Sequence, residues 1–347
     1  MADPTFDIPG DSAPSPAACP RPGRAWGALL LLAAAIWGLG TVVVKDTVGE
    51  LPPLWLVGIR FLAAGVLFCV ALAPRMARLA REGRLAGHLG AGVVLGVLVG
   101  GAYLLNTAGL TATTAAKSAF LTGTYCVLVP FQAWLVLRRV PTALNVAAGL
   151  LCVAGLGLVS LPAGEEVSFG IGEALTLGSA VFLGFHVVAT TRLAPGRDMV
   201  VLTGIQFATA GLMGVALGAL TEPAPDPALL AEPQVLANLA YLVLMATCVA
   251  LLLQNVAIPH VSPSTGALLL SFESVFGVLF AVLLLGEALT APMLAGFALI
   301  FAAVLVSEWL PDQLARRREP ASPDDAPGEA TGDTAALVAG DALAEER

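Results

Sequence analysis

The hydrophobic pattern of this 347-residue chain consists of long apolar runs separated by short polar segments. Each run has about 20 residues, the length that an α-helix needs to cross the hydrocarbon core of a bilayer at a rise of about 1.5 Å per residue. The ten runs cover residues 25–44, 54–73, 86–105, 115–137, 142–161, 171–191, 199–220, 235–258, 264–286 and 289–309. The pattern therefore predicts an all-α integral membrane protein with ten transmembrane helices.

The segments between and beside these runs are polar. Residues 74–84 contain four arginines and are predicted to be a basic loop. Residues 1–24 and 311–347 together hold 12 acidic and 6 basic residues, and their composition predicts two disordered tails. Residues 1–24 also lack the apolar centre of a signal peptide. The net charge of −8 comes mostly from these tails, so it says little about a partner.

The positions of the basic residues test the count of ten helices. If the N-terminus is cytoplasmic, 13 Lys and Arg residues fall in segments on the cytoplasmic side, and only Lys45 falls on the opposite side. Basic residues are enriched in cytoplasmic loops, and a miscounted helix would reverse the side of every later loop. The charge pattern therefore favours ten helices in the cytoplasmic (inner) membrane, with both termini in the cytoplasm.

Five helices in each half place the second half in the opposite orientation to the first. We predict two inverted five-helix repeats, residues 25–161 and 170–310, joined by a hinge at residues 162–169. Inverted repeats of this kind are common in secondary transporters, which bind substrate at the repeat interface near the middle of the membrane. A shift of 147 residues aligns only 7 identical residues over 45 positions, so internal sequence similarity is weak.

Composition indicates a membrane protein, and the motifs do not indicate an enzyme. The chain is 57% hydrophobic and 12% charged, whereas a soluble domain has about 25% charged residues. Four of its five cysteines lie inside apolar runs without a neighbouring His, which is typical of small core residues. We find no metal-binding, nucleophile or phosphate-loop signature, so we expect no metal, no cofactor and no catalytic activity. No feature indicates a nucleic-acid partner.

Glu273 is the residue that stands out within the apolar runs. Every other residue from Leu268 to Leu285 is apolar, Gly or Ser. A carboxylate at mid-membrane costs roughly 3 kcal/mol on insertion scales, so it normally faces a cavity or a partner. Gly266 and Gly277 share its helical stripe and are expected to leave space for water or a ligand. We predict that Glu273 binds a ligand amine or a proton; a structural ion pair is the alternative.

Arg60 and Lys117 are the candidate partners of Glu273. Both lie toward the outer ends of their runs, so snorkelling to the membrane surface is an equal alternative for each. If either residue reaches Glu273, the opposite charge keeps the carboxylate ionised. If neither does, Glu273 is the candidate site for a proton as the coupling ion.

Further polar and aromatic residues lie at mid-span. His186 has the chemistry to relay a proton or bind substrate, and an interhelical hydrogen bond is equally consistent. Trp37 is deep enough to line a cavity. The remaining candidate substrate-binding residues are Tyr103, Asn106, Tyr125, Gln254, Asn255 and Ser271. We predict that these groups line a cavity walled by the first, third, fourth, sixth, eighth and ninth helices.

A glycine repeat marks one face of the third predicted helix. Gly92, Gly96 and Gly100 recur at every fourth residue. This spacing places them on one smooth helix face, against which a neighbouring helix can pack closely.

Several segments resemble the EamA-type transporters of the drug/metabolite transporter superfamily. Residues 35–68 resemble the opening of this domain, and the segments 109–141, 174–194, 241–290 and 294–308 resemble later helices. The matching positions at the start are Trp37-Gly38, Lys45, Pro53 and Arg60-Phe61. The resemblance spans residues 26–309 and implies a ten-helix pair of inverted repeats that moves a small metabolite, often outward. One departure is Ser274, where the family commonly has a proline, so the usual reason for a kink in the ninth helix is missing.

Together these observations predict a secondary active transporter that works by alternating access. It would move a small metabolite, amino acid-like or amphiphilic, across the cytoplasmic membrane, with export expected. Transport would be coupled to the movement of a proton or another ion. The lipid bilayer is the other expected partner. An uptake carrier of the same fold and a non-transporting membrane scaffold are the alternatives, and no oligomeric state is indicated.

Overall fold

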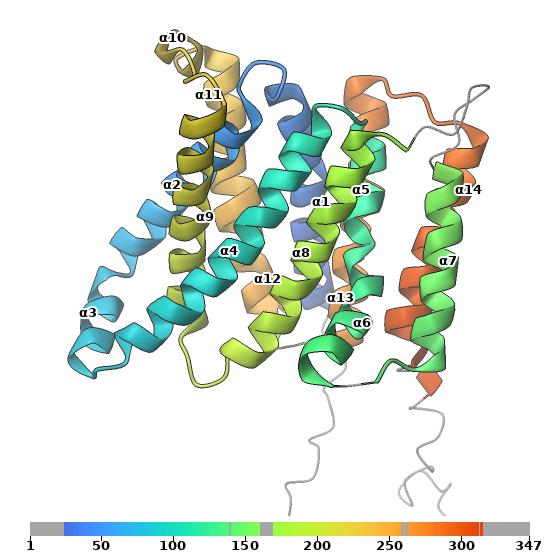
Figure 1. The fold of residues 1–347 in the computed structure, drawn as a ribbon, viewed down its shortest axis with the longest axis horizontal. Coiled ribbons are helices and arrows are strands. Elements are labelled where there is room, and N and C mark those ends of the chain that lie inside the picture. Colours follow the sequence, from blue (N-terminus) through green and yellow to red (C-terminus); the bar gives the residue numbers. More distant parts are fainter. Residues whose placement is uncertain are drawn as a thin grey trace, which may run out of the picture.

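The computed structural model describes residues 24–138, 140–159, 169–257, 260, 263–311 and 313–314. Regular structure in these residues is helical throughout (Figure 1). The predicted tails and the predicted hinge lie almost entirely outside the described residues.

Apart from α3, the helices of the first half follow the first five predicted runs. They are α1 (Arg24–Thr47), α2 (Pro53–Ala71), α3 (Ala73–Arg81), α4 (Leu85–Leu110), α5 (Ala115–Gly123), α6 (Tyr125–Leu137) and α7 (Ala143–Val159). The fourth run is divided at Thr124, whose hydroxyl donates to the carbonyl of Leu121 at 2.6 Å. A side chain that bonds its own backbone in this way competes with the regular helical pattern.

The helices of the second half follow the last five runs. They are α8 (Ile171–Leu193), α9 (Met199–Thr221), α10 (Pro227–Leu230), α11 (Pro233–Ala240), η1 (Tyr241–Val249), α12 (Ala250–Ala257), α13 (Pro263–Leu285), α14 (Ala291–Val304) and η3 (Leu305–Trp309). The two η segments are π-helical. α13 continues through Glu273 and Ser274 without a break, in keeping with the missing proline.

The length and composition of the helices fit a membrane. Within the described ranges, seven helices are long and apolar enough to cross a bilayer. Three shorter apolar helices cover Ala143–Leu158, Leu269–Leu285 and Ala291–Ser307. The prediction of a helical, multi-pass membrane protein is confirmed.

The prediction of a loop at residues 74–84 is wrong, because most of this segment forms α3. Leu79 is buried against Val201 and Ile205 of α9, and Met76 packs on the same cluster. Apolar residues three positions apart lie on one helix face, so the arginines between them face outward. Tertiary packing of Leu79 and Met76 on α9 thus supports a helix in a segment that charge alone marks as a loop.

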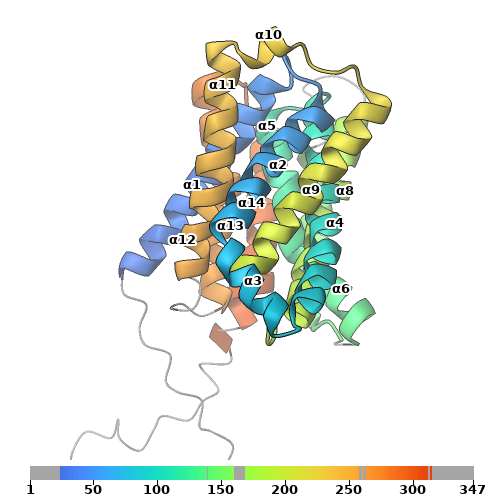
Figure 2. The same cartoon turned by 90° about the vertical axis from the view of Figure 1, so that its left-hand side faces the viewer.

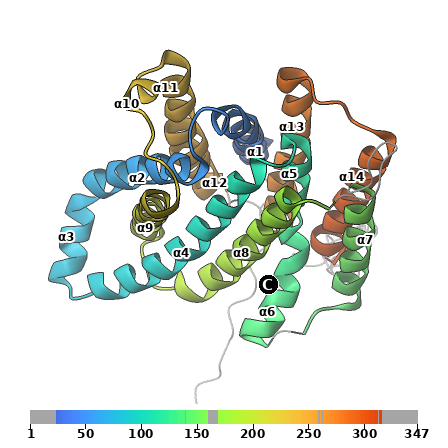
Figure 3. The same cartoon turned by 45° about the horizontal axis from the view of Figure 1, so that its top comes forward.

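The bundle is broad, with α7 and α14 paired at one edge and α2 beside α9 on the other side (Figure 3). The glycine stripe of α4 packs on α9, as its spacing predicts. A Cβ atom at Gly92 would lie 2.6 Å from Ile205, and one at Gly96 would lie 2.5 Å from Thr209. Small residues thus allow close contact between the two helices.

Candidate functional site

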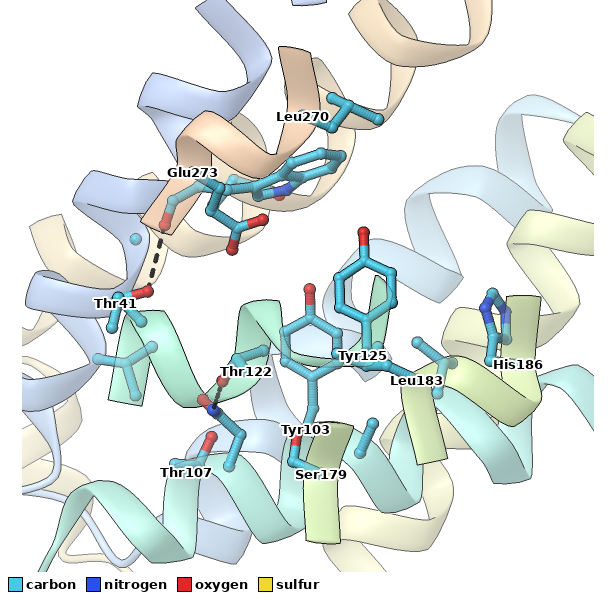
Figure 4. A pocket seen from close by; sticks show the side chains of 18 of the residues that line it. Thr41, Tyr103, Thr107, Thr122, Tyr125, Ser179, Leu183, His186, Leu270 and Glu273 are labelled. Atoms are coloured by element: carbon cyan, nitrogen blue, oxygen red, sulfur yellow. Dashed lines mark hydrogen bonds between the residues drawn. The ribbon is translucent and has the colours of Figure 1, made fainter. Parts of the chain in front are cut away.

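A cavity of about 250 Å³ lies in the centre of the bundle (Figure 4). Its walls come from the six predicted helices, with one further residue from α2. Eight of the predicted site residues line it: Trp37, Arg60, Tyr103, Asn106, Tyr125, His186, Gln254 and Glu273. The fold thus brings residues from seven separate apolar runs to one space.

Glu273 extends from α13 into this cavity. Its carboxylate and the hydroxyl groups of Tyr103 and Tyr125 point into the same open space (Figure 4). Gly277, one turn further along α13, was expected to leave room for a ligand, but it is filled by packing. A Cβ atom there would lie 2.6 Å from the side chain of Ala119. Gly277 therefore lets α13 pack closely against its neighbours, which positions Glu273. It does not itself line the cavity.

Arg60 is the cation of the cavity wall. Its side chain is buried, and its Nε donates to the hydroxyl of Thr247 at 3.0 Å. The guanidinium lies 5.2 Å from the ring centres of both Phe61 and Tyr103, a distance at which aromatic faces attract a cation. The ion pairs found in the described part of the chain include neither Arg60 nor Glu273. Two opposite charges therefore face the cavity without a salt bridge between them.

Lys117 does not pair with Glu273, contrary to one of the predicted arrangements. Its Nζ lies 3.3 Å from Oε1 of Glu173, and it is absent from the cavity lining. Glu173 is buried and also accepts from the hydroxyl of Thr113 at 2.8 Å. The reason is geometric: Lys117 and Glu173 lie in the first turns of α5 and α8, which meet at one end of the bundle, whereas Glu273 is in mid-helix.

Breaking this ion pair is expected to destabilise the fold. In Lys117→Met, the donors that remain for Glu173 among the described residues are Thr113 and Gly170, around a side chain that is 6% exposed. We expect a loss of about 2 kcal/mol, because a buried carboxylate is left undercompensated. Adding Glu173→Gln should recover part of this loss, because the amide carries no charge. Thermal unfolding of wild type, the single variants Lys117→Met and Glu173→Gln, and the double variant in detergent measures the coupling between the two side chains. Equal midpoints for wild type and Lys117→Met would contradict this prediction.

The π-helix η1 is bonded to the first two helices beside the cavity. Nε1 of Trp37 donates to the carbonyl of Ala246 at 2.7 Å, and the hydroxyl of Tyr241 donates to the carbonyl of Ile36 at 2.7 Å. The bond from Arg60 ends on the same π-helical segment. π-helical turns are frequent at functional sites, since their wider turn re-aims backbone groups. Hydrophobic periodicity carries no signal for such a turn, so the sequence reading missed it.

Some of the predicted polar residues also join helices. His186 of α8 bonds Gln206 of α9 at 2.8 Å, and Asn106 of α4 donates to the hydroxyl of Thr122 of α5 at 2.8 Å. Ser271 is buried but absent from the cavity lining. The side chain of Asn255 lies outside the described part of the structure. His186 and Asn106 therefore form interhelical hydrogen bonds and also line the cavity.

Ser179 is a cavity residue that the sequence reading missed. Its hydroxyl is buried and has no hydrogen-bond partner among the described residues. Ser179, Leu183 and His186 occupy positions i, i+4 and i+7 of α8, and all three line the cavity. This spacing defines one helix face, so the mid-helix histidine was the signal from which Ser179 could have been found.

Charged side chains hold the helix ends at the end of the bundle where α10 lies. Glu222 accepts the first backbone N–H groups of α2 at 3.0–3.3 Å, and Glu287 accepts those of α5 at 2.7 and 3.0 Å. Lys45 donates to the carbonyls of Leu110 and Thr113, both at 2.7 Å. Anions at helix starts and cations at helix ends satisfy backbone groups that have no partner inside the helix. Two carboxylates of the second half thus secure two helices of the first.

Comparison with known proteins adds a family and a fold. A family model described as the EamA-like transporter family matches residues 25–161 and again residues 170–309. A protein of Archaeoglobus fulgidus described as an uncharacterized transporter is 29% identical over 277 residues, which cover 80% of this chain and 83% of that protein. A solved crystal structure superposes with a TM-score of 0.58 at 20% identity, covering 86% of this chain and 99% of the other.

Proposed function

Because this chain belongs to the EamA-like transporter family, we propose that it is a secondary active transporter that exports a small metabolite by alternating access. The observation that carries this proposal is the central cavity, whose wall holds the carboxylate of Glu273 and the guanidinium of Arg60 without a salt bridge between them. Buried charges normally pair or bind a ligand, since leaving them unpaired is costly. We place the protein in the cytoplasmic membrane with both termini inside.

The proposed mechanism needs two inverted repeats, and the packing of the helices supports them. If α1, α2, α4, α5–α6 and α7 correspond to α8, α9, the continuous segment η1–α12, α13 and α14, then exchanging the sets converts most of the packing pairs into one another. The contact of α4 with α8 becomes that of α12 with α1, and the pairs α2–α9 and α7–α14 map onto themselves. α3 and α10, which follow the second helix of each set, lie at opposite ends of the bundle (Figures 1 and 2).

Alternating access would then open one end of the bundle at a time. At the end near α10, the bonds of Lys117 with Glu173 and of Glu287 with the start of α5 join the two halves. Opening that end would require these contacts to break, so we assign them to the state in which it is closed.

The cavity walls favour a small zwitterion as the substrate. Glu273 would bind an ammonium group and Arg60 a carboxylate, which a guanidinium binds with two parallel hydrogen bonds. Trp37, Tyr103 and Tyr125 would surround the apolar part. A volume of about 250 Å³ is close to the lower limit of ligand pockets, which suits a molecule the size of an amino acid.

Mass spectrometry of the culture medium tests the function. Cells that overproduce the protein are compared with cells that carry the empty vector. We expect at least one small compound to accumulate in the medium only when the protein is present. Accumulation inside the cells would instead indicate an uptake carrier of the same fold. No difference in either compartment over a range of nutrient conditions would contradict transport.

Counterflow into liposomes tests the substrate class. Proteoliposomes are loaded with a neutral amino acid, with the amine that lacks its carboxylate, or with the acid that lacks its ammonium group. We expect labelled amino acid to accumulate inside the liposomes only when they are loaded with the neutral amino acid. Each analogue would leave either Glu273 or Arg60 without its partner on the substrate. Equal counterflow with the amine or the acid would contradict a zwitterion site and leave the transporter assignment standing.

A further inference from the structure

A second cavity, of about 240 Å³, lies at the end of the bundle next to α3. It is bounded by α3, the first turn of α4 and the start of α9. Its polar lining consists of Arg75, Arg78, Glu82, Arg84, His88 and Asp198. None of these residues takes part in the central cavity, so the transporter proposal leaves this cluster unexplained.

The arginines of this cavity outnumber its carboxylates by three to two. Glu82 accepts from Nε of Arg78 at 2.9 Å and from Nη1 of Arg84 at 3.2 Å, and these bonds hold the pKa of the Glu82 carboxyl below its ordinary value. Asp198 lies 3.8 Å from Arg75, and its other oxygen caps the start of α9. Both carboxylates are thus occupied, and a net positive charge remains.

The free donors belong mainly to Arg75 and Arg78. In the described part of the chain, Arg78 uses its Nε for Glu82, which leaves both of its terminal nitrogens without a protein partner. The side chains of Arg75 and Arg78 are 59% and 83% exposed. A guanidinium fork matches two oxygens of a phosphate, which makes arginine the preferred residue for this ligand.

His88 holds the walls of the cavity together. Its Nε2 accepts the backbone N–H of Asp198 at 3.0 Å, so Nδ1 carries the proton that is donated to the carbonyl of Arg84 at 2.9 Å. The ring is 2% exposed and joins the start of α4 to the start of α9. A buried residue therefore fixes the helix ends that carry the exposed arginines of this cavity.

The position of the cavity points to lipid as the source of the ligand. α3 joins α2 to α4 at the end of the bundle opposite α10 (Figure 1). Helices that cross a bilayer leave the hydrocarbon core at their ends, so we place α3 near the membrane surface. The last turns of α2, just before α3, expose Val66, Leu67 and Val70. The exposed apolar side chains can contact the acyl chains of a lipid, and the basic cavity can bind its phosphate group. Clusters of basic residues next to a membrane-spanning helix attract anionic lipids.

We propose that this cavity binds the phosphate group of an anionic phospholipid from the adjacent leaflet. Arg75 and Arg78 contact the phosphate oxygens, and Arg84 and His88 position the walls. Glu82 opposes the bound anion, because its carboxylate faces the same space. The lipid thereby fastens α3 to the membrane surface.

Native mass spectrometry of the full-length protein tests this site. The protein in neutral detergent is mixed with equal amounts of phosphatidylglycerol and phosphatidylcholine. We expect wild type to retain phosphatidylglycerol preferentially, and the double variant Arg75→Gln, Arg78→Gln to lose this preference by about fivefold for each arginine removed. Glu82→Gln should increase retention, because it removes the opposing carboxylate. Arg192→Gln, an exposed arginine at the end of α8, is the matched control and should behave as wild type.

Three outcomes would overturn the proposal. Equal retention of the two lipids by wild type would remove the preference itself. A control variant that loses as much lipid as the double variant would show a general charge effect. Displacement of the lipid by millimolar inorganic phosphate would show that the cavity binds a free phosphate compound. If the double variant folds poorly, Glu82→Gln still tests the proposal, because it is expected to increase the retention of phosphatidylglycerol.

Discussion

Glu273→Gln is expected to fold normally and to lose transport. The amide has the shape of the carboxylate but no charge, so it cannot balance a substrate ammonium or exchange a proton. Losing one partner of a desolvated charge pair costs about 3 kcal/mol, which corresponds to a roughly 100-fold loss of transport at low substrate concentration. Folding should not suffer, because no ion pair of the described residues includes Glu273.

The measurement compares wild type and Glu273→Gln in counterflow and in transport driven by a pH gradient. Loss of both activities would identify Glu273 as a substrate residue. Loss of gradient-driven transport alone would identify it as the proton site. Glu50→Gln, which changes an exposed carboxylate in the turn after α1, is the matched control and should retain both activities. A fully active Glu273→Gln protein would exclude this residue from the mechanism, though not the fold.

Gly211→Leu is expected to prevent α2 and α9 from packing. A Cβ atom at Gly211 would collide with the backbone nitrogen of Leu62 and lie 2.5 Å from its Cα atom. On the same interface, a Cβ atom at Gly65 would lie 2.5 Å from the backbone nitrogen of Ala208. Backbone atoms cannot move aside as a flexible side chain can, so overpacking should cost about 3 kcal/mol or more. This exceeds the roughly 1 kcal/mol that leucine gains over glycine in helix propensity.

The yield of monodisperse protein and its thermal midpoint in detergent measure this effect. Gly90→Leu is the matched control, because Gly90 lies in α4 and a Cβ atom there meets open space. We expect Gly90→Leu to match or exceed wild type in stability, and Gly211→Leu to give little folded protein. Equal yield and equal midpoint for the two variants would mean that α2 and α9 do not approach each other as closely as described.

The sequence by itself determined the helices and much of the chemistry of the cavity. Apolar runs of membrane-spanning length predict helices because length and hydrophobicity are local properties. The stripe of Gly92, Gly96 and Gly100 predicts a close-packing face for the same reason, since its period depends only on neighbours along the chain. Polar residues inside apolar runs, above all Glu273, are unusual enough to be recognised without knowing what faces them.

Only the tertiary structure decided which groups meet. Lys117 pairs with Glu173 because the starts of α5 and α8 lie at the same end of the bundle. α3 is helical because Leu79 is buried on α9, and η1 departs from α-helical geometry while α1 and α2 bond to it. Each of these outcomes depends on contacts between segments far apart in the chain. A periodic pattern describes a segment's own faces, but the partner of each face is set by the three-dimensional arrangement of all the helices.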